Sequence, residues 1–118
     1  MIFVKLFAFP KSKRLLSSSE YKKVSGKAKK LHSGSFLFLY SPNEYSHARL
    51  GITVSKKCSK LAVKRNRLKR IIRESFRHMN GTLPNIDIIV IGKRSAITQD
   101  NATLLSTLDT LWKRLIEQ

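Results

Sequence analysis

The chain of 118 residues has few acidic side chains, almost no cysteine and no long apolar runs, and each shortage excludes a class of protein. Cys58 is the single cysteine, so a scaffold of intramolecular disulfides is impossible. No stretch approaches the roughly 18 consecutive apolar residues that a transmembrane helix needs. Seven acidic residues stand against 24 Lys and Arg, which gives a net charge of +17. A domain this basic most often binds a polyanion, either nucleic acid or an anionic membrane surface.

The length and apolar content are those of one folded domain. At 13.5 kDa and 42% apolar residues, the chain can close a small core, and its apolar stretches argue against intrinsic disorder. The first ten residues are apolar, but Lys5 interrupts them and Pro10 ends them, so we expect an N-terminal arm over residues 1–16 and no signal peptide. We therefore expect a single domain over residues 1–118, in a reducing, cytoplasmic compartment.

The scarcity of acidic residues also leaves little from which to build an active site. They stand singly, without the close carboxylate pair of a metal nuclease. His32, His47 and His78 are far apart, and none has a Cys or His partner at metal-ligand spacing. A nucleophilic Cys58 stays open, although a partly buried cysteine without a catalytic role is far commoner. If the protein takes part in catalysis, we expect the catalytic groups to belong to a partner.

The positive charge is concentrated in two segments. Residues 1–30 hold nine basic residues against Glu20, a net charge of +8, and residues 56–78 hold ten against Glu74, a net charge of +9. In the rest of the chain, five basic and five acidic residues cancel. A solubilising surface would mix both signs over the whole protein. The distribution therefore indicates two basic surfaces on an otherwise neutral domain.

Three apolar segments predict strands. Residues 36–40 form an aromatic-rich run, and residues 49–55 alternate apolar with small or polar side chains. The turn signals over residues 42–46 predict that these two strands pair as an antiparallel hairpin. Residues 86–91 are apolar on nearly every position, which predicts a central strand that is covered on both faces.

Three segments predict helices. Ser17 and Glu20 have the spacing of a capping box, which predicts a short helix from about Ser18 to Ser25 that ends at Gly26, before a basic connector over residues 27–30. Residues 60–79 predict an amphipathic helix with a cationic polar face, with Ser59 as its cap. Its expected apolar arc consists of Leu61, Leu68, Ile71, Ile72, Phe76 and Met79. Residues 101–116 predict a core-packing helix that begins after Thr98 or Asp100.

The cationic helix favours nucleic acid as the partner. Arginine side chains bind phosphate in a bidentate way that lysine cannot match. Among them, Asn66 suits a base edge, a ribose hydroxyl or the orientation of a neighbouring Arg. A solvated surface is the alternative for any charge run, but this one has almost no acidic partners to relieve repulsion. Phe36, Phe38 and Tyr40 share one strand face, either as core or as side chains that stack on unpaired bases.

The sequence Arg65-Asn66-Arg67, followed by Lys69-Arg70 and Arg73, is a long and specific motif. Further matching segments are Gly51-Ile52-Thr53-Val54-Ser55-Lys56-Lys57, the early Phe9-Pro10-Lys11 with Arg14-Leu15, the strand at 86–91 and Leu111-Trp112-Lys113-Arg114. In this order the chain resembles the bacterial ribonuclease P protein component over roughly residues 8–116.

The resemblance implies an α/β fold: a two-layer sandwich of about four strands packed by three helices, in the order α-β-β-β-α-β-α. It also implies an unusual left-handed β-α-β crossover, against the general preference for right-handed connections. The chain would be a single RNA-binding domain that binds the catalytic RNA of ribonuclease P and the 5′ leader of precursor tRNA. The holoenzyme removes this leader as an endonuclease, using Mg²⁺ that is held mainly by RNA.

The resemblance assigns two sets of residues. Those implied to bind the catalytic RNA are Lys64, Arg65, Asn66, Arg67, Lys69, Arg70, Arg73 and Arg77. Those implied to line a leader-binding cleft between the first helix and the sheet are Phe9, Lys11, Arg14, Tyr21, Phe36, Phe38, Lys56 and Lys57. One departure is Ser25, where relatives often have a second aromatic side chain one turn after the first.

The resemblance implies no catalytic side chain, no tightly bound cofactor or metal on the protein, and no obligate protein or membrane partner. Two other classes stay open. A general or ribosome-associated RNA-binding protein would share the basic helix without a processing role. A self-sufficient nuclease would need an active site that the sequence does not reveal.

Overall fold

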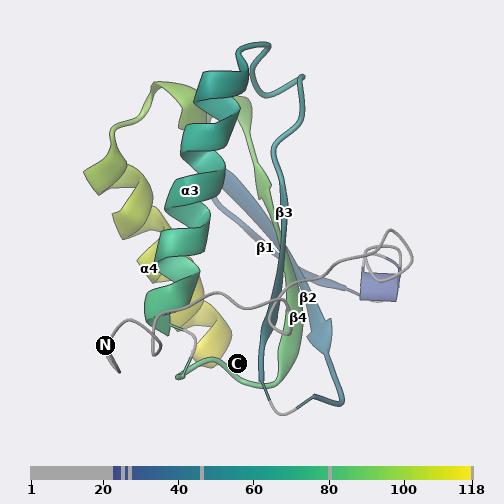
Figure 1. The fold of residues 1–118 in the computed structure, drawn as a ribbon. Helices are drawn as coiled ribbons and strands as arrows, with labels where there is room; N and C mark the ends of the chain where they lie inside the picture. Colours follow the sequence, from purple (N-terminus) through teal and green to yellow (C-terminus); the bar gives the residue numbers. More distant parts are fainter. Residues whose placement is uncertain (1–22, 25, 27, 46, 80, 118) are drawn as a thin grey trace, which may run out of the picture.

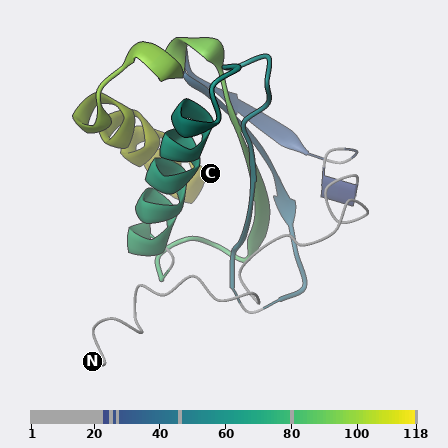
Figure 2. The same ribbon diagram turned by 45° about the horizontal axis from the view of Figure 1, so that its top comes forward.

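A computed structural model describes residues 23–24, 26, 28–45, 47–79 and 81–117 of the chain. The elements are β1 (Lys29–His32), β2 (Phe36–Pro42), β3 (Arg49–Thr53), α3 (Ala62–Met79), β4 (Ile86–Gly92), the 3₁₀ helix η2 (Arg94–Thr98) and α4 (Asn101–Ile116). They form two layers, with α3 and α4 side by side against one face of a four-stranded sheet (Figures 1 and 2). The predicted α/β sandwich with a four-stranded sheet is confirmed.

The strands lie in the order β1-β2-β4-β3, with β1–β2 and β2–β4 antiparallel and β3–β4 parallel. β4 is an inner strand with all but one residue buried, which confirms the prediction for residues 86–91. The predicted hairpin of residues 36–40 with 49–55 is wrong, because β4 lies between β2 and β3. The end of β2 and the start of β3 are two strand spacings apart, about 10 Å, which is within reach of six connecting residues. α3 then connects the parallel pair β3 and β4 as a β-α-β unit.

The residue patterns do not predict the edge strand β1, because they treat residues 27–30 as a basic connector, although the order implied by the resemblance includes a third strand before α3. β1 pairs with β2 from Lys29 opposite Tyr40 to His32 opposite Leu37. Only Leu31 of its four side chains is buried, so the strand has almost no hydrophobic pattern to reveal it. Exposed lysines on such an edge oppose pairing with another sheet.

The core lies between the sheet and the two helices. Phe36 and Phe38 on β2 are fully buried there, and the Phe38 ring lies 4.6 Å from that of Trp112 on α4, measured between ring centroids. Phe76 of α3 contacts the same indole at 5.9 Å, and the indole N–H donates to Ser75 Oγ at 2.7 Å. One tryptophan therefore joins the sheet, α3 and α4, as expected for the core role of residues 101–116.

The ends of α3 follow local hydrogen bonding. Ser59 Oγ accepts from the Leu61 N–H at 3.2 Å, and α3 begins at Ala62. Leu61 thus lies before the first turn and is 57% exposed, although the sequence places it on the apolar arc. At the other end, the N–H groups of Thr82 and Leu83 donate to the Met79 carbonyl, and the chain turns toward β4.

A buried ion pair fixes the starts of β3 and β4. Arg49 donates from Nε to Asp87 Oδ1 at 2.8 Å and from Nη2 to Oδ2 at 2.7 Å. Asn43 Nδ2 also donates to Oδ1 of the same carboxylate, at 2.8 Å. Such a bidentate geometry stabilises a buried charge pair, and here it holds the edge strand β3 in register with β4.

The first predicted helix, about residues 18–25, lies mostly outside the described residues. Lys23, Val24 and Gly26 have helical backbone, so Gly26 still belongs to this segment. Val24 is buried with Ile89, Leu39 and Ile91, on the sheet face opposite α3 and α4. In the described part of the chain, no helix is both long and apolar enough to cross a membrane.

Candidate nucleic-acid interface

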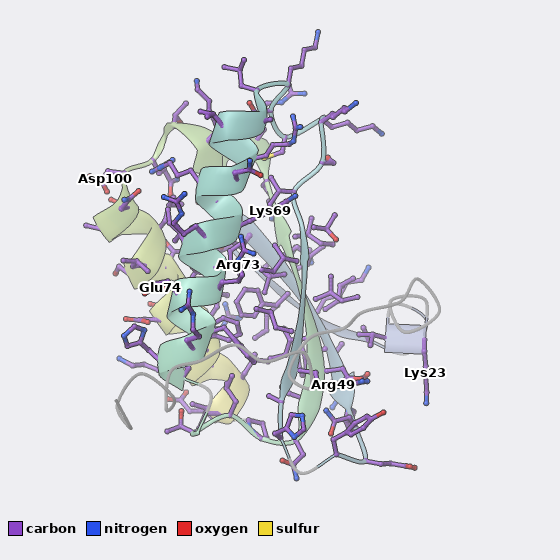
Figure 3. All side chains as sticks on the ribbon, in the orientation of Figure 1. Lys23, Arg49, Lys69, Arg73, Glu74 and Asp100 are labelled. Atoms are coloured by element: carbon purple, nitrogen blue, oxygen red, sulfur yellow. The ribbon has the colours of Figure 1, made fainter. Side chains whose placement is uncertain are left out.

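The polar face of α3 is a cationic surface. The helix carries seven basic residues and one acidic residue, Glu74. Lys64, Asn66 and Arg70 are exposed, and Figure 3 shows Lys69 and Arg73 on the side of α3 that faces β3. Every residue that the sequence assigns to binding the catalytic RNA therefore lies on this one helix: Lys64, Arg65, Asn66, Arg67, Lys69, Arg70, Arg73 and Arg77.

Three of these side chains have partners within the protein. Arg77 Nη2 forms an ion pair with Glu74 Oε2 at 2.7 Å. The guanidinium of Arg65 donates to the carbonyl oxygens of Ser59 and Lys60, both at 2.9 Å. Arg67 reaches in the other direction, and its Nη2 donates to the Gln99 carbonyl at 2.6 Å. The cations with free donor groups are thus fewer than the motif implies.

A second basic site lies at the turn before α3. The side chains that line an open concavity of about 650 Å³ are Lys56, Lys57, Cys58, Ser59, Lys60 and Arg94. Arg94 donates from Nη2 and Nε to the Lys57 carbonyl, at 3.3 and 3.4 Å, which attaches η2 to the turn. Lys60 and Arg94 are absent from the sequence-based assignment. Their only sequence signal is their charge, because Arg94 reaches the turn through its contact with Lys57, a residue 37 positions away in the sequence.

Cys58 contributes to packing in this turn. Its thiol is buried and donates from Sγ to the Lys93 carbonyl at 3.3 Å. Burial raises the pKa of the Cys58 thiol, and the charge of Arg94 offsets this only in part. A thiol that stays protonated is a poor nucleophile, so the geometry favours the structural interpretation of this residue.

The leader-cleft assignment of Phe36 and Phe38 is wrong. Both rings have 0% exposed surface, because they point toward α3 and α4 and not toward the opposite face of the sheet. Alternation along the strand correctly groups them on one face, but does not say which face the helices cover. The half-buried Leu37 and Leu39 are the β2 side chains on the opposite face. Four further candidates, together with Ser25, lie outside the described residues: Phe9, Lys11, Arg14 and Tyr21.

The acidic side chains of this region have structural partners. Asp87 is paired with Arg49, Glu74 with Arg77, and Asp100 accepts from the N–H of Thr103 at the start of α4. Within the described ranges, no group of three His, Cys, Asp or Glu side chains is placed to hold a metal ion. The site that the geometry offers is a surface for anions.

Comparison with known proteins identifies the family of this chain. The Ribonuclease P family model matches residues 9–116. The ribonuclease P protein component of Marinobacter nauticus is 45% identical over 113 residues, 95% of this chain and 85% of that protein. That of Idiomarina loihiensis is 42% identical over 115 residues, 97% of this chain and 92% of the other.

Solved structures give the same result for the fold. The Staphylococcus aureus RNase P protein superimposes with a TM-score of 0.82 at 32% identity, over 87% of this chain and 94% of that one. The Thermotoga maritima RNase P protein gives a TM-score of 0.77 at 33% identity, over 86% of this chain and 96% of the other. The chain therefore belongs to the ribonuclease P protein family, whose members are the protein component of that ribonuclease.

Proposed function

We propose that the polar face of α3 binds the catalytic RNA of ribonuclease P, and that the basic turn before it contacts the 5′ leader of precursor tRNA. The observation that carries the first part is the cationic surface of α3, where Lys64, Asn66 and Arg70 are exposed and Lys69 and Arg73 are half-buried. Phosphate groups of RNA are its natural ligands, because each contact releases condensed counterions. Family membership favours this role over that of a general RNA-binding protein.

The leader-binding part rests on the basic turn before α3. Lys56 and Lys57 are exposed, and with Lys60 and Arg94 they line a concavity without an acidic side chain among its lining residues. Precursor and mature tRNA differ by the leader, so a surface that binds it raises affinity for substrate over product.

The proposed chemistry belongs to the RNA. The carboxylates of Asp87, Glu74 and Asp100 take part in ion pairs or a helix cap, which supports a protein that binds and positions RNA. Mg²⁺ held mainly by the RNA would supply the activated water and stabilise the leaving oxygen. A cytoplasmic location is part of the same proposal.

Reconstitution tests this division of labour. We expect precursor tRNA to be cleaved at low Mg²⁺ only when protein and catalytic RNA are combined. The RNA alone should need higher Mg²⁺, and the protein alone should leave the substrate intact. Cleavage by the purified protein alone would show a self-sufficient nuclease. No stimulation of the RNA would favour a general RNA-binding protein.

The leader contact is tested by a paired substitution in the turn. Lys56→Gln with Lys57→Gln should weaken holoenzyme binding of precursor tRNA several-fold, and that of mature tRNA little, because only the precursor has the leader. Lys113→Gln with Arg114→Gln removes the same charge from exposed positions on α4 and should leave the ratio of the two affinities unchanged. An equal loss for both tRNAs in the turn variant would contradict the leader assignment.

A further inference from the structure

The two arginines of the Arg65-Asn66-Arg67 motif bind the protein's own backbone. Arg65 points back along α3, and one nitrogen, Nη1, is 2.9 Å from the carbonyl oxygens of both Ser59 and Lys60. Arg67 points toward the start of α4, where its Nη2 is 2.6 Å from the Gln99 carbonyl and its Nε 3.0 Å from Asn101 Oδ1. Both residues are half-buried.

Each arginine holds a segment that carries or supports other cations. The residues held by Arg65 belong to the turn whose concavity is lined by Lys56, Lys57, Lys60 and Arg94. Arg67 joins α3 to the connection between η2 and α4. The side chain of Gln99 extends this link, since its Oε1 accepts from Ser35 Oγ at 2.8 Å. The backbone on both sides of the motif is therefore fixed relative to α3.

Neighbouring positions on the same helix lack such contacts. Lys64, Asn66 and Arg70 are exposed, and the structure gives them no hydrogen-bonding or ionic partner among the described residues. Their donor groups can bind phosphate without breaking an internal bond. For Arg67, a bidentate grip on phosphate through Nε and Nη2 would compete with the bonds to Asn101 and Gln99, and a partly buried carbonyl without a donor is unfavourable.

We infer that Arg65 and Arg67 are positioning residues for RNA binding: they hold the basic turn and the start of α4 against α3, while exposed neighbours such as Lys64 and Arg70 contact phosphate. This inference rests on the proposed RNA-binding function of α3. It divides a motif of uniform charge into two roles, according to which guanidinium groups already have acceptors within the protein.

The salt dependence of binding distinguishes the two roles. Each phosphate contact contributes roughly 0.7–0.9 to the slope of log affinity against log salt concentration. Arg70→Ala should therefore weaken binding of catalytic RNA and reduce this slope by about that amount. Arg65→Ala and Arg67→Ala remove the same charge and should also weaken binding, but change the slope by less than half as much. Arg67→Gln, which keeps an N–H donor without the charge, should recover part of the lost affinity.

Hydrogen exchange of the free protein provides a readout that does not depend on RNA. Arg67→Ala should speed exchange of the amides of Thr103 and Leu104 in the first turn of α4, and Arg70→Ala should leave them unchanged. Asn101→Ala should weaken RNA binding in the wild-type background and have less effect in Arg67→Ala, because both changes remove the same contact.

The outcomes separate the two proposals. A slope reduced equally by Arg67→Ala and Arg70→Ala, with unchanged exchange at the start of α4, would overturn the positioning role and leave RNA binding by α3 intact. Failure of the wild-type protein to bind catalytic RNA would overturn the proposed function, and with it the inference. If Arg67→Ala does not fold, Arg67→Gln provides the same comparison of slopes.

Discussion

Asp100 is the residue on which the start of α4 depends. Its Oδ1 accepts from the N–H of Thr103 at 2.8 Å, the expected geometry of an N-cap. This hydrogen bond lowers the pKa of the Asp100 carboxyl, and the positive charge of Arg67 acts in the same direction. The ionised form is therefore the one that stabilises the folded protein, by bonding to a free N–H and by its position at the positive end of the helix dipole.

Acidification should remove this stabilisation. Because the pKa is lower in the folded than in the unfolded state, the contribution is complete above the ordinary Asp value of about 3.9 and is lost as the pH falls through the folded value. We expect Asp100→Ala to melt at a lower temperature than the wild type at pH 6, and the difference to shrink toward pH 2. The measurement is thermal unfolding by circular dichroism.

Asp109→Ala, in the middle of the same helix, controls for the loss of one negative charge from α4. The pH-dependent change in melting temperature is expected for Asp100→Ala and not for Asp109→Ala, because Asp100 alone of the two is the cap. If the melting difference for Asp100→Ala stayed constant from pH 6 to pH 2, the carboxylate would not be the stabilising species.

At the scale of elements, the sequence predicts strongly patterned segments well. α3 and α4 begin within two residues of the predicted positions, because their apolar residues recur at helical spacing and their ends carry caps and stops. β4 is predicted as a central strand for a similar reason, since all its positions are apolar except Asp87 and the terminal Gly92. Periodicity depends on residues that are close in the sequence, and in these elements the nearby residues alone are enough to show it.

The elements that fail depend on distant partners. β1 has one buried side chain, Leu31, and its strand conformation depends on pairing with β2. The hairpin prediction fails because the turn signals after Pro42 do not show that the neighbour of β2 is β4, more than 40 residues later, and not β3. The candidate site divides in the same way: the cationic face of α3 follows from spacing, whereas the concavity with Arg94 and the internal bonds of Arg67 require the tertiary fold.

At the scale of the whole molecule, the net charge of +17 acts in opposite directions on folding and on binding. In the free protein, like charges along α3 and the turn repel one another, and this destabilises the compact state. In the complex, the same charges face phosphates, and their release of counterions drives association. Added salt screens both effects, because the Debye length is about 10 Å at 0.1 M salt.

We therefore expect NaCl to stabilise the protein and weaken its RNA complex. Raising NaCl from 50 to 200 mM should increase the melting temperature of the free protein by a few degrees. On the scale for duplex DNA, six to ten phosphate contacts predict an affinity loss of roughly 10³–10⁵ over the same range. Arg70→Gln should raise the melting temperature at 50 mM NaCl and weaken RNA binding, because it removes one repelling charge from an exposed position.

Arg77→Gln is the matched control, because it removes the same charge from the same helix but breaks the ion pair with Glu74. Its melting temperature at 50 mM NaCl should not rise, since the loss of an attractive contact opposes the relief of repulsion. Melting is measured by calorimetry and RNA affinity by filter binding in the same buffers. Together they show whether NaCl raises or lowers the melting temperature and the affinity. A melting temperature that falls with NaCl would mean that attractive ion pairs outweigh repulsion in the free protein. The basic surface would then not require a polyanion to offset its cost.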